Sequence, residues 1–308
     1  MVYVTDYSRS MSTTIRHEPS EAAKCVAASR EAHDVTLAGS GTEFLFYTAV
    51  RDGHLEGYRI PRTPEFKTPN NPGVSALGLQ RQEMALATWA SENGIPSAQP
   101  VDLIEQDGFP VLIVSVVDDD GSELDAAALG GAIASMHRLQ PPRIDFVAQD
   151  NTPVAARIAQ RVAHRHAELS KNVQLPTLPT PERMLRDLEA HMGPPRPTHL
   201  DIRRQNVRVQ EGRPLSLFDW SNALPAAPEL EIARIEEYAA IAANGLGYKA
   251  FREGYAAAGG VVNETSAAWP LFRLDAAVML AVVFSSVAPD EALRTLFVGR
   301  IRGLLKEL

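Results

Sequence analysis

Hydrophobic and polar positions in the first third of the chain follow a pattern typical of strands. Runs rich in β-branched and aromatic residues lie on both sides of Gly39 and Gly41, and a further run follows the Asp-Gly turn at residues 52–53. Two more runs lie within residues 101–117, separated by a second Asp-Gly. Because short glycine-containing turns reverse the chain between strands, the pattern predicts five antiparallel strands.

Helical spacing of apolar residues dominates the rest of the chain. The stretch 61–76 contains four prolines and is expected to be loop as far as about Ala76. Two short strands are expected around residues 211–212, inside the otherwise helical second half. The run from Ala276 to Pro289 is nearly apolar but shorter than the ~20 residues of a membrane span, so it predicts a buried helix. Helices are predicted over residues 19–30, 81–94, 126–139, 154–169 and 182–192, and again towards the C-terminus.

This order of elements predicts an α+β protein with two lobes. Residues 1–30 are expected to form a polar arm and a short helix. Residues 31–117 are expected to form a lobe with a five-stranded antiparallel sheet and one helix. Residues 118–308 are expected to form a larger, mainly helical lobe, joined to the first by a hinge near residues 115–118.

Composition and charge narrow the classes of partner. The 308 residues include 38 acidic and 30 basic side chains, and the formal charge of −8 disfavours binding to a nucleic-acid backbone. The one cysteine, Cys25, excludes an internal disulfide framework and leaves too few thiolates for a structural zinc site. We therefore expect a cytoplasmic protein, monomeric or homodimeric, without nucleic-acid or membrane partners.

The segment His199-Leu-Asp201-Ile-Arg-Arg-Gln-Asn206, with Asp219 thirteen residues later, carries the clearest chemical signal. Asn206 and Asp219 fall at the two ends of the predicted hairpin, so both side chains can present oxygen ligands to one point. Amide and carboxylate oxygens suit Mg²⁺. Asp201 would lie beside them as an acceptor for a hydroxyl proton. Together these groups meet the demand of phosphoryl transfer for positioning and charge neutralisation.

At these residues the sequence resembles the aminoglycoside phosphotransferase and choline kinase group, small-molecule kinases with a protein-kinase-like fold. Their catalytic loop reads His-Gly-Asp, four further residues and Asn, and a metal-binding Asp follows a hairpin. The resemblance covers nearly the whole chain from about His33 onward. It implies that Asp201 is the catalytic base, that Asn206 and Asp219 hold Mg²⁺, and that His199 braces the loop.

The same resemblance assigns residues of the first lobe to the nucleotide. Arg59, in the segment YRIPR, stands where protein kinases place a phosphate-binding lysine, and its planar guanidinium suits phosphate oxygens. Glu83, on the following helix, is its expected ion-pair partner. The glycine-containing turn is expected to act as a flap over the phosphates. The turn and the hinge complete the nucleotide set with Gly39, Ser40, Gly41, Thr42, Ser115 and Val117.

Two further positions of the catalytic loop bear on the mechanism. Arg203, two residues after Asp201, stands at the offset of a protein-kinase lysine and is expected to reach the transferring phosphoryl group. The adjacent Arg204 is the alternative for this role. Leu200 replaces the glycine that usually follows the histidine in the resembled group.

The acceptor is expected to bind between the catalytic hairpin and the helices after Trp220. From Asp219 to Tyr255 the acidic residues outnumber the basic ones by six to three, which favours a polar acceptor that is cationic or neutral. Glu229 and Glu231 are the acids expected to contact the substrate. Glu231 also stands at the later acidic position of the resembled group.

The sequence therefore predicts a kinase that transfers the γ-phosphoryl group of ATP, or alternatively GTP, to a hydroxyl of an antibiotic or related natural product, in resistance or self-protection. A metabolite kinase acting on choline, an amino alcohol or a sugar-like acceptor is the alternative within the class. A catalytically silent kinase-like binding protein is disfavoured because Asp201, Asn206 and Asp219 are all present. Metal-dependent hydrolysis lacks the ligand cluster that it needs.

Overall fold

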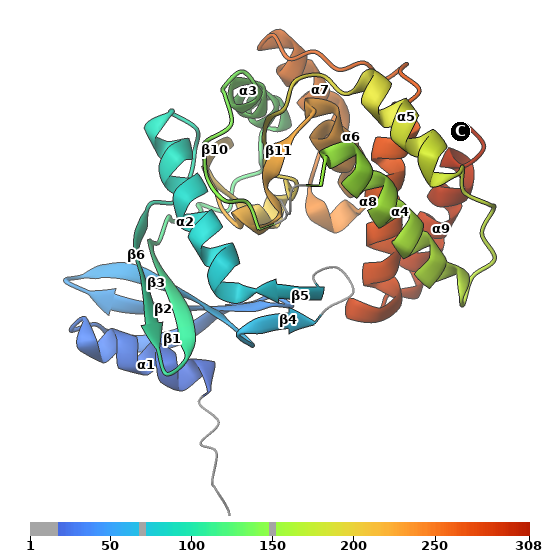
Figure 1. Cartoon of the computed structure of the whole chain (residues 1–308). Coiled ribbons are helices and arrows are strands. Elements are labelled where there is room, and N and C mark those ends of the chain that lie inside the picture. Colours follow the sequence, from blue (N-terminus) through green and yellow to red (C-terminus); the bar gives the residue numbers. More distant parts are fainter. Residues whose placement is uncertain (1–17, 68–71, 148–151) are drawn as a thin grey trace, which may run out of the picture.

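Five strands form one antiparallel sheet in the computed structural model, which describes residues 18–67, 72–147 and 152–308 (Figure 1). The strand order is β1-β2-β3-β7-β6, and every neighbouring pair is antiparallel. The five predicted strands are therefore confirmed. They are β1 (His33–Ser40), β2 (Phe44–Arg51), β3 (His54–Pro61), β6 (Pro100–Gln106) and β7 (Phe109–Ser115).

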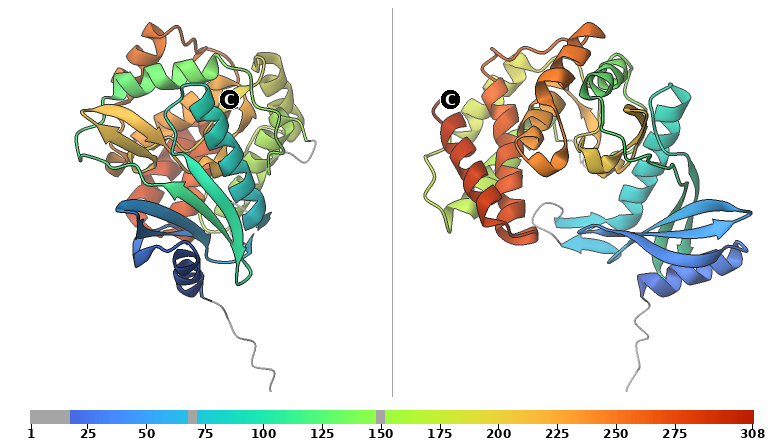
Figure 2. Two further views of the ribbon diagram at one scale, coloured as in Figure 1. Left: turned by 90° about the vertical axis from the view of Figure 1, so that its left-hand side faces the viewer. Right: turned by 180° about the vertical axis from the view of Figure 1, so that it is seen from behind.

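Helices cover both faces of this sheet (Figure 2). On the outer face, α1 (Pro19–Ser29) buries Ala23 and Val26 against Tyr58 and Ile113, in a small apolar core of its own. On the other face, α2 (Ala76–Glu92) runs from the sheet towards the helical lobe. Its first turn is capped by the hydroxyl of Ser75, which accepts a hydrogen bond from a backbone N–H of that turn.

The prediction that residues 61–76 are loop as far as about Ala76 is wrong in one part. Within this stretch β4 (Glu65–Lys67) and β5 (Pro72–Ser75) pair as a short antiparallel hairpin. Proline is compatible with such a two-stranded ribbon because the first residue of a strand can leave its nitrogen outside the ladder. Phe66 of β4 packs edge-on against Phe44, with 5.2 Å between the ring centres, which ties the hairpin to the main sheet.

Helices build most of the second lobe, as predicted. Helices α3 and α7 pack closely because glycine lies where they meet. A larger residue at Gly130 would not fit, since its Cβ would lie 2.1 Å from the carbonyl oxygen of Phe251. One large apolar core runs through the lobe and includes Trp220, Phe272 and Phe297. The helices are α3 (Ala126–His137), α4 (Val154–Ser170), α5 (Pro181–His191), α6 (Pro228–Ala239), α7 (Tyr248–Ala257), α8 (Trp269–Val282) and α9 (Glu291–Leu304).

The apolar helix begins earlier than the sequence indicates: α8 starts at Trp269 rather than near Ala276, and it continues into a π-helical turn, Val283–Val287. The combined segment, Trp269–Val287, has the length and composition of a membrane-crossing helix. It is, however, 61% buried within the protein, where it packs against α4, α6 and α9. The expected buried helix is thus present.

Two short strand pairs hold the segments with the candidate chemistry. The predicted hairpin consists of β9 (Val207–Gln210) and β10 (Arg213–Leu217). A second pair, β8 (Arg196–Thr198) with β11 (Leu224–Ala226), was not predicted. The loop from β8 to β9 carries residues 199–206, and the loop from β10 to β11 carries Asp219. Both loops are therefore anchored at each end and lie side by side.

Candidate active site

Asp201 lies at the centre of the site, and hydrogen bonds fix the orientation of its carboxylate. Its Oδ1 accepts a hydrogen bond of 2.9 Å from the hydroxyl of Tyr238, on α6. Its Oδ2 accepts hydrogen bonds from Asn206 Nδ2 at 2.7 Å and from Arg203 Nη2 at 3.3 Å. Asp201 is only 6% exposed, so few orientations are open to the carboxylate, and it faces the cleft in a defined position.

His199 joins the two catalytic segments. Its Nδ1 accepts a hydrogen bond from the backbone N–H of Asp201 at 3.2 Å, and its Nε2 donates to the carbonyl oxygen of Phe218 at 3.1 Å. The ring is fully buried and lies against Trp220. Burial lowers the pKa of His199, in agreement with a neutral ring that accepts at one nitrogen and donates at the other. The position of His199 fits the expected bracing of the loop.

Asn206 and Asp219 meet at the base of the β9–β10 hairpin, as their spacing predicts. The backbone N–H of Phe218 donates to the carbonyl oxygen of Asn206 at 3.2 Å, which closes the hairpin. The Asn206 amide nitrogen donates to Asp201 Oδ2 and, at 2.9 Å, to the Asp201 carbonyl oxygen. These bonds occupy the nitrogen and leave the amide oxygen as the atom available to a cation.

Asp219 is the second predicted oxygen ligand, and its carboxylate lines the same cleft. Its backbone has a left-handed conformation, with φ of 64° and ψ of 63°. Among the described residues, its side-chain partners are Ser221 and Arg59 Nη2, the latter at 2.7 Å, and both bond Oδ1. Burial alone would raise the pKa of Asp219, but the guanidinium of Arg59 lowers it, so the carboxylate is charged at neutral pH. One amide oxygen and one charged carboxylate fit a hard cation such as Mg²⁺.

Arg59 and Glu83 form the ion pair that the resemblance implies. Arg59 Nη1 donates to Glu83, and the guanidinium lies 3.6 Å from the centre of the Phe44 ring. Burial raises the pKa of Glu83 to about 7, even though Arg59 opposes this shift. Arg59 thus connects β3, α2 and the candidate metal ligand Asp219 at the border of the two lobes.

The predicted flap residues span the end of β1 and the turn into β2, because Gly39 and Ser40 belong to β1 while Gly41 and Thr42 follow it. Arg62 holds this turn, donating to Ser40 Oγ at 2.6 Å and to the Gly41 carbonyl oxygen at 2.9 Å. The turn, the ion pair, the hinge and the catalytic loop all line one cleft of about 1520 Å³. The predicted residues that line it are Gly39, Ser40, Gly41, Thr42, Arg59, Glu83, Ser115, Val117, Asp201, Arg203, Asn206 and Asp219.

A sequence profile of the phosphotransferase enzyme family matches residues 66–272, more than half of the chain. The chain belongs to this family. It is therefore a phosphotransferase that acts on hydroxyl groups of small molecules, as the catalytic loop predicts. No curated protein sequence matches the chain.

Solved structures resemble this phosphotransferase along most of its length. A thermostable mutant of aminoglycoside phosphotransferase APH(4)-Ia is 15% identical, with 92% of this chain and 98% of that chain covered and a TM-score of 0.61. A putative fructosamine-3-kinase from Haemophilus somnus 129PT is 11% identical, with 92% and 97% covered and a TM-score of 0.65. APH(2")-IIa, in a complex with gentamicin, is 11% identical, with 90% and 94% covered and a TM-score of 0.60. At these identities the likeness shows a shared kinase-like fold.

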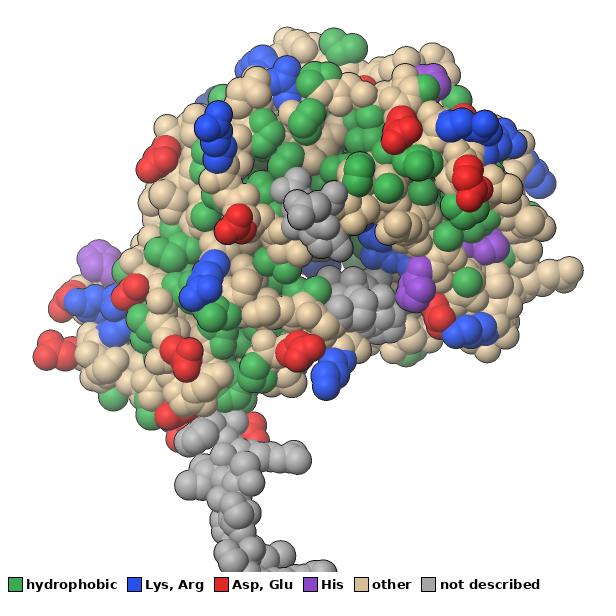
Figure 3. Space-filling view, in the orientation of Figure 1, with side chains coloured by type: hydrophobic (Ala, Val, Ile, Leu, Met, Phe, Trp, Pro, Cys, Tyr) green, Lys and Arg blue, Asp and Glu red, His purple; other side chains and the backbone are tan. Residues whose placement is uncertain are grey.

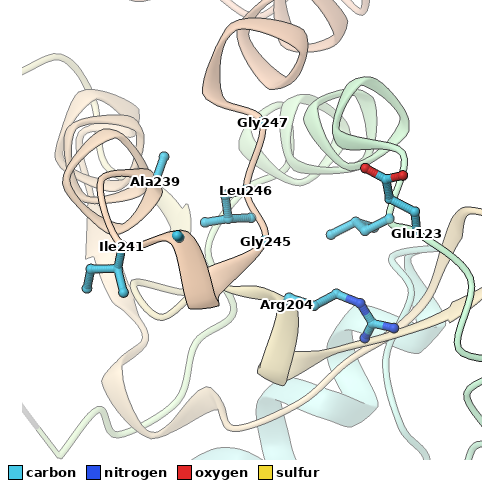
Figure 4. Close-up of a pocket in the computed structure, with 9 residues that line it drawn as sticks. Glu123, Arg204, Ala239, Ile241, Gly245, Leu246 and Gly247 are labelled. Atoms are coloured by element: carbon cyan, nitrogen blue, oxygen red, sulfur yellow. The ribbon is translucent and has the colours of Figure 1, made fainter.

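The structure also distinguishes the two adjacent arginines of the catalytic loop. Arg204 forms two hydrogen bonds of 2.9 Å with the carboxylate of Asp119 and lines a separate small pocket beside Glu123 and Gly245 (Figure 4). Arg203 lines the large cleft and contacts Asp201. Arg203 therefore faces the large cleft beside Asp201, while Arg204 fastens the loop to the segment before α3.

The prediction that Glu231 contacts the substrate is wrong. Glu231 is fully buried on α6, where its Oε1 accepts hydrogen bonds of 2.7 Å from the backbone N–H groups of His199 and Leu200. Its Oε2 lies 2.7 Å from Nε2 of His137. Burial would raise the pKa of Glu231, but the bond with His137 lowers it. The other acid, Glu229, is half-buried and lies outside the residues that line the cleft.

Glu231 instead positions the catalytic loop. Leu200 has a φ of 60°, in the left-handed region that favours glycine, and it occupies the position where glycine is usual. The bonds from Glu231 to the two N–H groups hold this strained backbone in place. Leu200 is itself buried in the main core, so packing of its side chain offsets the backbone cost.

We expect Glu231→Ala to lower the free energy of unfolding by about 3–5 kcal/mol, because it leaves two buried N–H groups and His137 without their acceptor. Urea unfolding measures this change. The matched control is Glu229→Ala, on the same helix turn but outside the cleft, which should change stability by less than about 0.5 kcal/mol. Equal stability of the two variants would contradict the positioning role.

Two residues important to the site carry no recognisable signal in the sequence. Tyr238, which bonds Asp201, is an ordinary aromatic residue on α6 in the sequence pattern. Gln82, on α2, donates from Nε2 to the backbone carbonyl oxygen of Trp220 at 2.9 Å, and its Oε1 accepts from the N–H of Val147. Gln82 is 2% exposed and thereby fastens α2 to the loop that follows Asp219.

Proposed function

We propose that this phosphotransferase moves the γ-phosphoryl group of ATP to a hydroxyl of a small molecule, an antibiotic or related natural product. The observation that carries the proposal is the convergence of Asp201, Asn206 and Asp219 in one cleft. These groups would supply a proton acceptor and two metal ligands within one cleft. GTP is the alternative donor.

The roles follow from the geometry. The acceptor hydroxyl would lie against Asp201, whose carboxylate takes the proton as the hydroxyl oxygen bonds to the γ-phosphorus and the bond to the ADP oxygen breaks. Tyr238 and Asn206 hold that carboxylate in place. Arg203 would neutralise charge on the transferring group, and Arg59 would bind the remaining phosphates. Asn206 and Asp219 would hold Mg²⁺, which neutralises phosphate charge when bound.

The nucleotide assignment is supported by one further likeness. The APH(4)-Ia mutant of 13% identity was solved in a ternary complex with AMP-PNP and hygromycin B, with 92% of this chain covered and a TM-score of 0.61. A structure of the same fold therefore accommodates an ATP analogue together with an acceptor in one molecule. We propose the same arrangement for this chain, with the flap and Arg59 on the nucleotide side.

A metabolite kinase remains the second candidate function, and two observations favour it. One is the likeness to the putative fructosamine-3-kinase. The other is the loss of support for a cationic acceptor, which within this class favours a sugar-like acceptor over choline or an amino alcohol. Apart from Asp219, the acids counted between Asp219 and Tyr255 do not line the cleft, and Glu237 is fully buried in ion pairs with Arg273 and Arg300.

An assay of ADP release tests the proposal. The enzyme, with ATP and Mg²⁺, is offered hydroxylated antibiotics and metabolite alcohols in turn, and mass spectrometry detects the added phosphoryl group. We expect ADP release to depend on one class of acceptor. A protein that binds ATP but phosphorylates nothing in any class would instead be the silent binding protein.

A further inference from the structure

Three arginines meet in the helical lobe on the acceptor side of the cleft. Arg161 and Arg165 lie on α4 and Arg234 lies on α6, and all three line the cleft. They share the fully buried carboxylate of Asp275, on α8. Arg161 Nη2 lies 2.7 Å from Oδ2, Arg234 Nη2 lies 3.1 Å from Oδ2, and Arg165 Nη1 lies 3.4 Å from Oδ1. We call these three residues the arginine cluster.

Among the residues that the structure describes, the charge of the arginine cluster is not balanced. Three guanidinium groups share one carboxylate, which leaves 3 − 1 = 2 excess positive charges. Burial, together with the neighbouring Arg161 and Arg234, lowers the pKa of Arg165 to about 10 even with Asp275 in contact. Uncompensated buried charge is costly, so the site favours a further anion.

A second buried carboxylate in the same lobe shows the contrast. Glu237 is also fully buried and bonds to Arg273 and Arg300, and the neighbouring Glu236 bonds to Arg273 as well. There the charges balance, 2 − 2 = 0, and neither arginine lines the cleft. The excess positive charge is thus confined to the group that faces the cleft.

The described lining of the cleft as a whole also has a net positive charge. Its described lining includes seven arginines and four carboxylates, although the chain as a whole carries a charge of −8. Basic side chains are visible in the hollow between the two lobes (Figure 3). On the acceptor side, Asp201 is the one carboxylate among the described lining residues, since Glu43, Glu83 and Asp219 lie towards the flap and Arg59.

The arginine cluster adjoins the catalytic loop directly. Arg234 Nη1 donates to the carbonyl oxygen of Leu200 at 2.9 Å, next to Asp201 in the chain. Tyr238, one turn further along α6, bonds Asp201 itself. Arg234 is 3% exposed, and its Nε is a buried donor without a hydrogen-bond partner among the described residues. An anion held here would therefore bring the rest of its molecule close to the proton acceptor.

An apolar wall lies beside the arginine cluster. It is formed by α8, its π-helical turn and the first turn of α9, through Met279, Leu280, Val283, Phe284 and Leu293. Phe284 stacks on Phe297 at 6.0 Å between ring centres, which supports the wall from behind. Apolar side chains beside a few charged groups are typical of a pocket for an amphipathic ligand.

We propose that the acceptor is a hydroxylated acid, whose carboxylate or phosphate is bound by Arg161, Arg165 and Arg234 while its apolar part lies on the α8 wall. The proposal rests on the proposed kinase function and names the substrate class for it. Guanidinium groups bind both kinds of oxyanion through paired N–H groups. Cationic acceptors such as aminoglycosides are disfavoured, because like charges would face each other in the cleft.

Matched compounds test the proposal by binding and by turnover. Medium-chain ω-hydroxy carboxylates, the corresponding hydroxyalkyl phosphates, the primary amides and the amines share a chain and a hydroxyl but differ in charge. We expect the carboxylate or the phosphate to bind about 10–100-fold more tightly than the amide in titration calorimetry, and the amine more weakly still. Comparison of the affinities of the carboxylate and the phosphate identifies which anion the arginines prefer.

Two arginine variants separate the anion site from a structural role. Arg161→Gln should raise the KM of the acid about tenfold, while the KM of ATP and the binding of the amide stay unchanged. Arg273→Gln is the matched control. Arg273 pairs with the buried Glu237 as Arg161 pairs with the buried Asp275, but Arg273 lies outside the cleft. If Arg161→Gln fails to fold, Arg161→Lys takes its place. It keeps the charge and should retain most of the affinity for the acid.

The outcomes distinguish this inference from the proposed function. Turnover of a neutral or cationic acceptor, with no effect of Arg161→Gln on its KM, would keep the kinase function and overturn the anion site. Acids that bind tightly but are never phosphorylated would keep the anion site and overturn the kinase function. Equal effects of Arg161→Gln and Arg273→Gln would reduce the arginine cluster to a structural element.

Discussion

Replacing Asp201 by asparagine is expected to lower kcat by about 10²–10⁴-fold, the range of a lost general base. Asparagine has nearly the same shape, so Tyr238 and Asn206 keep a partner at this position, but the amide cannot take the hydroxyl proton. The KM of the nucleotide should change little, because Arg59 and the flap are untouched. Steady-state kinetics with the phosphorylated acceptor measures both constants.

Tyr238→Phe is the control for this prediction. It removes one hydrogen bond to Asp201 Oδ1 and leaves the ring and the carboxylate in place. We expect a decrease in kcat that is clearly smaller than that of Asp201→Asn, because the carboxylate keeps its bonds to Asn206 and Arg203. Full activity of Asp201→Asn would remove Asp201 from the role of proton acceptor.

Asp219→Ala should lose at least about 10²-fold in kcat at ordinary Mg²⁺ concentrations, because one of two protein ligands of the cation is removed. The fold should remain intact, since the side chain faces the cleft and Arg59 keeps its ion pair with Glu83. Raising the Mg²⁺ concentration should recover part of the activity. A titration of kcat against Mg²⁺, with thermal unfolding alongside, measures both effects.

Asp119→Ala provides the comparison for Asp219→Ala. Asp119 also pairs with an arginine, Arg204, but it does not line the large cleft. Its loss should therefore leave the Mg²⁺ dependence unchanged. Wild-type turnover of Asp219→Ala, or the same Mg²⁺ response in both variants, would show that the cation is held elsewhere.

The sheet and the catalytic segments could be predicted because their signals are local. Five strands follow from runs of β-branched and aromatic residues and from turns that contain glycine. The proximity of Asn206 and Asp219 could be predicted because pairing of two short strands brings the ends of a hairpin together, independently of the rest of the chain. The β4–β5 hairpin was missed because its prolines were interpreted only as breaks, although proline can begin a strand such as β5.

Other parts of the site depend on contacts between distant segments, and no pattern in the sequence reports them. Glu231 was expected at the substrate because it lies in the acidic stretch after Asp219, but the packing of α6 under the catalytic loop buries it completely. Arg161 and Asp275 meet across more than a hundred residues, at a junction of three helices. The count of acidic residues after Asp219 likewise included side chains that do not line the cleft, and only the fold decides which way they point.

Gln82 has a consequence for how the enzyme can be controlled. Many kinases are switched by swinging the helix of the first lobe that carries the glutamate partner of the phosphate-binding residue. Here that helix, α2, is tied to the second lobe through Gln82 and through Glu83, Arg59 and Asp219. Displacement of α2 would break the hydrogen bond from Gln82 to Trp220 and the ion pair between Glu83 and Arg59 together. We therefore expect the enzyme not to be switched by movement of α2.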